Sequence, residues 1–216
     1  ENVSHFIALS ALSSVKSFVI SDTICVMPAK QPQMFSYNCF FLYLSMLLNH
    51  SCRNLYNGKL LPLRGAISFD EYVFDSQRKI FLGKAISVAY KWEQKQKWVG
   101  ASICPDLVEG SMPDTLDFKP LTERKLLVNW DVPTSDGIVS TLAVNFVTQE
   151  TSATILANLQ TEYDRCEPAI KPKYYAAICF VRHICEKDLF VAHHEIADLQ
   201  KWIEGAAKKR QKIWQH

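Results

Sequence analysis

The fold is decided by residues 63–93, which read LRGAISFDEYVFDSQRKIFLGKAISVAYKWE. Residues 63–69 form an apolar run with a charge near its start, and residues 80–82 form a shorter apolar run that stops at Gly83. The apolar residues that follow recur at helical spacing on one face: Ala85, Ile86, Ala89 and Trp92. The stretch therefore predicts a strand, a loop, a short strand and a helix, in that order.

Upstream, residues 15–20 and 23–27 predict two strands joined by a tight polar turn at Ser21 and Asp22. Residues 35–48 predict a largely buried helix, packed beneath a sheet or into a subunit interface. The further expected elements are the end of a helix at 6–14, strands at 98–104 and 124–130, a long proline-marked loop at 106–120, a turn at 132–137 and helices at 151–166, 173–185 and 197–214. The pattern predicts one α/β sandwich with a helical C-terminal extension.

The composition is that of an ordinary globular chain, with 48% hydrophobic and 21% charged residues among 216. A formal charge of +2 gives no strong attraction to nucleic acid or to a membrane, so neither is expected as a partner. No secretory signal is visible, and the apolar run at 35–48 is about 14 residues long, too short to span a bilayer. A basic cluster near the C-terminus (Lys208, Lys209, Arg210 and Lys212) indicates a solvated helix face.

The seven cysteines are scattered without C-x-x-C pairs. An odd number at such spacings favours reduced thiols and a cytoplasmic location. Cys179, His183 and Cys185 lie close together in the sequence, but their spacing matches no standard zinc motif. These three residues therefore predict a buried helix face in preference to a metal site.

The order of elements in residues 63–93 resembles the central motif of class III nucleotidyl cyclases, an R-x-G-I strand followed by a G-x-x-V-N-x-A-x-R-L-E helix. The residues that fill the helix frame here are Gly83, Ile86, Ser87, Val88, Ala89, Lys91, Trp92 and Glu93. The resemblance covers roughly residues 15–105. It implies a ferredoxin-like α+β cyclase domain over residues 1–148, with a mostly antiparallel sheet and helices packed on it. Residues 149–216 would be the helical extension, packed on the same domain. It also implies a head-to-tail homodimer with its sites at the subunit interface.

In this family a hairpin tip, commonly written I-G-D or F-S-D, carries the second of two metal-binding aspartates, and Asp22 stands at that position. The resemblance thus implies that Asp22 binds one of two divalent ions, Mn²⁺ or Mg²⁺. The alternative is that an aspartate favours turns for local reasons. The family's first aspartate lies in an F-x-D-I-x-G-F strand, which nothing before Asp22 matches. That strand is expected upstream of Glu1, the alternative being a metal-free pseudoenzyme.

On the helix after Gly83, the family's asparagine and arginine positions fall on Ser87 and Lys91. The asparagine orients the ribose and the arginine stabilises charge on the transferring phosphate, so the resemblance implies catalytic roles for Ser87 and Lys91, with Arg64 as a further cation. A lysine is a point charge and cannot reproduce the planar fork of an arginine. The alternative for Lys91 is an ordinary exposed helix lysine. Glu93 and Tyr90 are expected to be structural.

Purine cyclases read the base with a lysine four residues before the hairpin aspartate and a polar residue three before the helix glycine. Those positions are Phe18 and Ile80, both apolar, so the candidate nucleotide-binding residues Phe18, Ile80 and Ser21 lack the purine-reading pair. The chain is similar to the bacterial pyrimidine cyclases of Pycsar antiphage defence, which favour an S-D hairpin, an L-R-G-A-I-S strand and a G-x-A-x-x-x-A-Y helix. Asp70 stands where those relatives often have glycine.

The function implied by the resemblance is cyclisation of UTP or CTP to cUMP or cCMP with release of pyrophosphate. The product would be an antiviral alarm signal to a separate effector activated by the cyclic nucleotide. One rival is a catalytically inactive cyclase-like domain that binds nucleotide or protein. The other is a ferredoxin-like nucleic-acid-binding module, since that fold also serves RNA readers, but it is disfavoured by the near-neutral charge and by the lack of an aromatic-rich basic strand.

Overall fold

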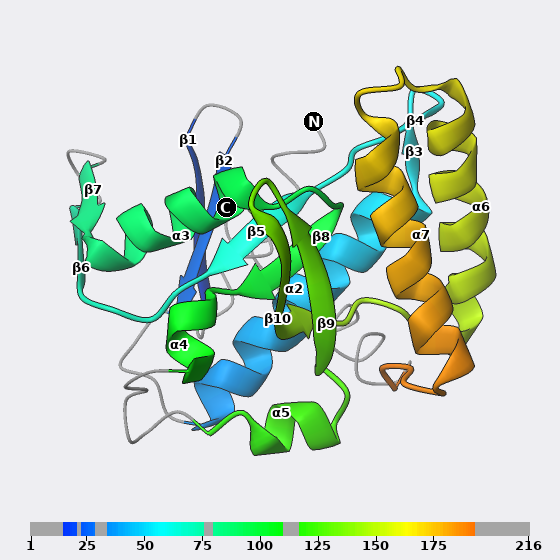
Figure 1. The fold of residues 1–216 in the computed structure, drawn as a ribbon. Coiled ribbons are helices and arrows are strands. Elements are labelled where there is room, and N and C mark those ends of the chain that lie inside the picture. The colour runs from blue at the N-terminus through cyan, green and yellow to red at the C-terminus, as the bar shows by residue number, and fades with distance from the viewer. Residues whose placement is uncertain (1–14, 21–22, 29–33, 76–79, 110–116, 193–216) are drawn as a thin grey trace, which may run out of the picture.

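The computed structural model describes residues 15–20, 23–28, 34–75, 80–109 and 117–192, which form a mixed α/β structure (Figure 1). The first half contains β1 (Val15–Ile20), β2 (Thr23–Pro28), α2 (Met34–Arg53), β3 (Leu55–Tyr56), β4 (Lys59–Leu60), β5 (Arg64–Ile67), β6 (Tyr72–Asp75), β7 (Ile80–Gly83) and α3 (Lys84–Lys95). The second half contains β8 (Gly100–Ile103), α4 (Pro105–Glu109), α5 (Lys119–Glu123), β9 (Leu127–Thr134), β10 (Gly137–Val144), α6 (Gln149–Arg165) and α7 (Lys171–Glu186).

The largest sheet has four strands in the order β5-β8-β10-β9. Its β5 and β8 are parallel, whereas β10 is antiparallel to both of its neighbours. Three further hairpins, β1–β2, β3–β4 and β6–β7, are two-stranded sheets of their own. Figure 1 shows α2 running behind the four-stranded sheet, with the β6–β7 hairpin at the outer edge of the molecule. The α/β class agrees with the sequence prediction, and the ferredoxin-like cyclase topology stays a prediction.

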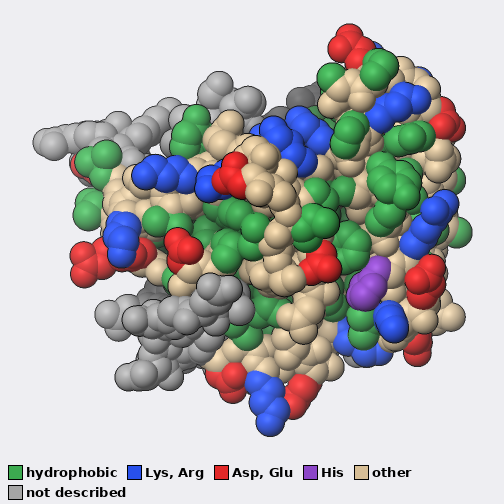
Figure 2. All heavy atoms as spheres, in the orientation of Figure 1, with side chains coloured by type: hydrophobic (Ala, Val, Ile, Leu, Met, Phe, Trp, Pro, Cys, Tyr) green, Lys and Arg blue, Asp and Glu red, His purple; other side chains and the backbone are tan. Residues whose placement is uncertain are grey.

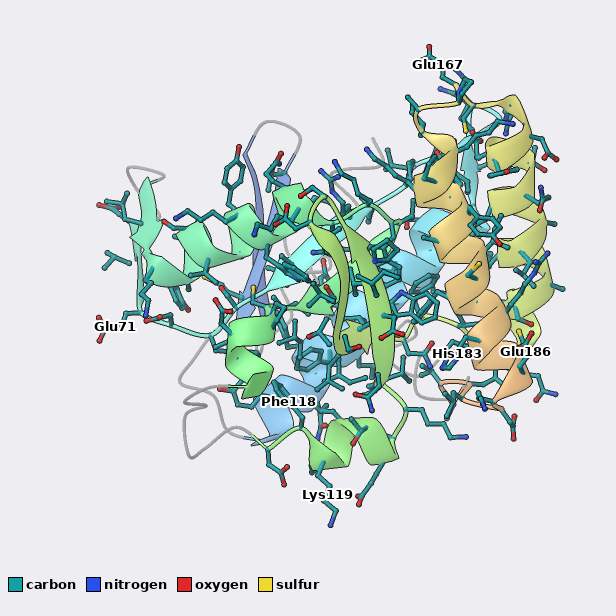
Figure 3. All side chains as sticks on the ribbon, viewed as in Figure 1. Glu71, Phe118, Lys119, Glu167, His183 and Glu186 are labelled. Carbon is teal, nitrogen blue, oxygen red and sulfur yellow. The ribbon has the colours of Figure 1, made fainter. Side chains whose placement is uncertain are left out.

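Helix α2 lies in the core of this chain. Tyr37, Phe41, Leu48 and Cys52 are all buried, and the ring of Phe41 meets that of Phe118 edge-on at 6.5 Å between centroids (Figure 3). Of the two predicted settings for residues 35–48, the structure has the helix packed beneath the sheet. These buried residues are therefore not available to an interface between subunits.

The C-terminal helices share the same core. Ile155 and Leu159 of α6 and Phe180 of α7 are fully buried, and Phe180 packs edge-on against Trp98 with ring centroids 5.2 Å apart. A capping box between Thr148 and Thr151 starts α6. Both helices were predicted, whereas the expected helices at 6–14 and 197–214 lie outside the described residues.

The structure differs from the sequence prediction in three places downstream of β8. Residues 132–134, expected in a turn, extend β9, and β10 was not predicted although it is a central strand. Pro133 suggested a break, but a proline is tolerated on an edge strand, and β9 is at the edge. The expected loop at 106–120 overlaps the short helices α4 and α5, whose prolines stand in the first turn where no hydrogen bond is lost.

No helix in the described part of the chain is both long and apolar enough to cross a membrane.

Candidate functional site

The predicted hairpin is present, with β1 and β2 antiparallel and Ile20 paired with Thr23. Ser21 and Asp22, which join these two residues in the sequence, lie outside the described residues. The backbone of Phe18 pairs with Cys25, and that of Ile80 pairs with Asp75 at the start of β7. The side chains of Phe18 and Ile80 also lie outside the described part, so their roles toward a nucleotide stay predictions.

The junction between β7 and α3 requires a glycine. Gly83 has φ 147°, in the region that favours glycine, and caps the start of α3. A Cβ on this residue would overlap the carbonyl oxygen of Glu71 and lie 2.6 Å from the Cα of Tyr72. The close approach of β6 therefore fixes where α3 begins. Figure 3 labels Glu71 at the outer end of the molecule, where the chain enters β6.

Asp70 secures the same end of α3. Its carboxylate lies 2.8 Å from the Nζ of Lys84, the first residue of the helix, and accepts a hydrogen bond from the backbone N–H of Glu71. The hydrogen bond from Lys84, followed by that from Glu71, lowers the pKa of Asp70. Ser68 adds a hydrogen bond to the carbonyl oxygen of Ala85. Asp70 thus neutralises the charge of Lys84.

The exposed face of α3 carries the two predicted catalytic residues of the helix. Ser87 is exposed and donates a long hydrogen bond, 3.4 Å, to the carbonyl oxygen of Gly83. Lys91 is exposed one turn later. Lys84 and Lys95 share its side of the helix, but each is paired at 2.8 Å, with Asp70 and Asp136 respectively. Among the described residues, Lys91 has no carboxylate within ion-pair distance.

Arg64 lies in a different setting. Its Nε forms an ion pair with Glu93, and its Nη1 donates a hydrogen bond to the carbonyl oxygen of Gln96 at 3.1 Å. Both charged side chains are only about a quarter exposed, at 25% and 24%. The pair fastens the start of β5 to the C-terminal end of α3, so Glu93 has the structural contact that the sequence predicted, and the guanidinium of Arg64 is engaged there too.

A buried hydrogen-bond network around Gln96 also connects the end of α3 to β5, and the sequence did not predict it. The side-chain oxygen of Gln96 accepts hydrogen bonds from Trp98 (2.7 Å) and Ser102 (3.0 Å), and its amide nitrogen donates to the carbonyl oxygen of Gly65 at 2.9 Å. Trp92 completes the network by donating to the Ser102 hydroxyl at 2.9 Å. Trp98 and Ser102 are near Gln96 in the sequence, but they form no recognised motif with it, and the third partner, Gly65, is distant along the chain.

Tyr90 departs from its expected structural role. Its side chain is 65% exposed, and it makes no hydrogen bond or ring contact with the described residues. It follows Ser87 by three positions and precedes Lys91, so the three residues share the solvent-facing side of α3.

The described residues contain no group of three or more His, Cys, Asp or Glu side chains that could hold a metal ion. Cys179, His183 and Cys185 all lie on α7, where they are partly and not fully buried, and the ring of His183 lies 5.6 Å from that of Trp130 (Figure 3). Acidic and basic side chains are interspersed on the face shown in Figure 2, with no patch of one sign.

The chain was compared with protein-family models, curated proteins and solved structures, and nothing matched in any of the three. The resemblance to class III cyclases rests on the residues of this sequence.

Proposed function

We propose that this chain is a nucleotidyl cyclase that converts UTP or CTP into cUMP or cCMP and pyrophosphate. The observation that supports the proposal most is Lys91, an exposed cation without an ion pair among the described residues, one turn from the Ser87 hydroxyl. The helix that carries both residues, α3, is capped by Gly83 and is attached to β5 by the ion pair between Arg64 and Glu93. These features match the frame in which the similar cyclases hold a ribose and a phosphate.

In the proposed reaction, the ribose 3′ oxygen attacks the α-phosphorus of its own nucleotide. The bond from this phosphorus to the bridging oxygen breaks, pyrophosphate leaves, and the proton of the 3′ hydroxyl passes to water. Negative charge grows on the phosphoryl oxygens, and the ammonium group of Lys91 would offset it. The Ser87 hydroxyl would hydrogen-bond the ribose. Arg64 would add positive charge only if it left Glu93.

The resemblance also implies two divalent ions, Mn²⁺ or Mg²⁺, with Asp22 as one ligand. No group of three or more His, Cys, Asp or Glu side chains within the described residues supplies such a site. The other ligand would be the family's first metal-binding aspartate, which nothing before Asp22 matches.

The partners that belong to this proposal are a second copy of the chain, since the similar cyclases build their sites between subunits, and a separate effector activated by the cyclic nucleotide in antiviral defence. The cytoplasm is the compartment that suits this role and the unpaired thiols. The competing function is an inactive cyclase-like domain. It would bind UTP without forming a cyclic product.

The proposal is tested on the full-length protein, given UTP or CTP with Mn²⁺, with the products identified by mass spectrometry. We expect a cyclic nucleotide and pyrophosphate from the wild type, and a rate reduced by about 10²–10³-fold in Lys91→Gln. Lys91→Arg should retain activity because it keeps the charge. Lys59→Gln, which removes an exposed lysine on another element, is the control and should match the wild type. Equal rates for Lys91→Gln and the wild type would refute the role of Lys91.

A further inference from the structure

Tyr90 is the most exposed tyrosine in the described part of the chain, at 65%. The other exposed tyrosines are Tyr175 at 56% and Tyr72 at 43%, and the ring of Tyr175 has an aromatic neighbour, Tyr163, at 6.3 Å. A single exposed aromatic side chain is ordinary on a protein surface. What distinguishes Tyr90 is the chemistry of the residues beside it.

Tyr90, Ser87 and Lys91 form a short band across the exposed face of α3. Residues three and four apart on a helix are neighbours, with Cβ atoms about 5–6 Å apart. Tyr90 and Lys91 therefore both adjoin Ser87, one on each side of it around the helix. The order across the face is an aromatic ring, a hydroxyl and a cation.

A nucleotide presents three matching groups in the same order, a flat base, a ribose hydroxyl and a phosphate. We propose that Tyr90 stacks on the base of the bound nucleotide. The inference rests on the proposed function, which places the ribose at Ser87 and the phosphates at Lys91. Stacking uses the π-face that every base has, so Tyr90 contributes affinity for nucleotides in general and not the choice between pyrimidine and purine.

The test is equilibrium binding of an analogue that cannot be cyclised, α,β-methylene-UTP, in the presence of Mn²⁺. In this analogue a carbon replaces the oxygen through which pyrophosphate would leave. We expect Tyr90→Ala to raise the Kd by about 5–150-fold, the range that corresponds to loss of one base–aromatic stack. Tyr90→Phe keeps the ring and should stay within about twofold of the wild type. The matched control is Tyr175→Ala, which removes another exposed tyrosine and should bind like the wild type.

Circular dichroism of each variant checks that the fold is intact, as expected for changes at exposed positions. The adenosine analogue should lose affinity by the same factor in Tyr90→Ala. The stacking role is wrong if Tyr90→Ala binds as tightly as the wild type, if Tyr175→Ala loses as much affinity, or if the wild type binds no nucleotide. Turnover of UTP is measured separately. If the wild type turns over UTP but Tyr90→Ala binds the analogue as tightly as the wild type, only the stacking role is refuted. If Tyr90→Ala weakens binding but the wild type forms no cyclic product, only the cyclase activity is refuted.

Discussion

Lys84, Lys91 and Lys95 occupy one side of α3, and their surroundings differ. The first and last are paired with Asp70 and Asp136, while Lys91 has no such partner among the described residues. The sequence identified Lys91 through its place in the helix motif. It could not predict that the flanking lysines are neutralised, because their carboxylates come from segments distant along the chain.

Gly83 makes a prediction about stability. Gly83→Ala should lower the free energy of unfolding by about 2–4 kcal/mol, because the new Cβ meets the backbone of Glu71 and Tyr72 in a conformation that disfavours side chains. Gly137→Ala is the matched control, since Gly137 has a similar φ of 124° with no atom within 4 Å of the added Cβ. Urea unfolding measures both. Equal losses in the two variants would mean that contact with β6 does not fix the start of α3.

Arg64 attaches α3 to β5 through Glu93 and Gln96, and a catalytic role is proposed for it as well. Arg64→Lys keeps the charge but loses the fork that reaches both Glu93 and Gln96. We expect a loss of about 1–3 kcal/mol in the free energy of unfolding, measured in urea, against no change for the exposed Arg182→Lys. Unchanged stability together with abolished turnover would assign Arg64 to catalysis instead.

Among the helices and strands, the sequence predicted those in which the apolar residues recur with a clear period. The β1–β2 hairpin, α2, α3, β8, α6 and α7 all appear near their expected positions. Strand β10 was missed because Pro133 and Gly137 suggested a turn, and the pairing that makes β10 a strand comes from β8 and β9. The network around Gln96 was missed for a related reason, since its partners meet only in the folded chain.

The β1–β2 hairpin carries the prediction about metal. Asp22→Asn should preserve folding, because the change is nearly isosteric and a turn accepts either residue. It should abolish turnover supported by Mn²⁺ or Mg²⁺ if the carboxylate holds an ion. Circular dichroism and product formation are measured on the same sample. Undiminished activity in the variant would remove Asp22 from the site.

Across the whole molecule, all seven cysteines are free in the structure. Burial raises the pKa of Cys52 to about 12, and burial followed by the charge of Asp106 raises that of Cys104 to about 12. At pH 8 the reactive thiolate is therefore scarce at both residues. We expect thiol titration of freshly purified, denatured protein without reductant to find seven thiols. In the native protein Cys52 and Cys104 should resist alkylation. A titration below seven would indicate paired cysteines and contradict a reducing compartment.

One core joins the predicted cyclase-like part to α6 and α7, so the described chain provides a single scaffold for the face of α3. The side chains expected to read the base, Phe18 and Ile80, are apolar, and a purine edge buried without partners would lose about 1–3 kcal/mol for each unmade hydrogen bond. A pyrimidine has a smaller edge to satisfy. The base preference that we propose would therefore come from Phe18 and Ile80 and not from the face of α3.

The most direct measurement gives the full-length protein an equimolar mixture of UTP, CTP, ATP and GTP with Mn²⁺ and follows each cyclic product by mass spectrometry. We expect cUMP or cCMP to form faster than cAMP or cGMP, with one pyrophosphate released for each cyclic nucleotide. Equal or faster formation of a purine product would defeat the pyrimidine preference and leave the cyclase in place. No cyclic product from any of the four, with a folded protein, would contradict the cyclase itself.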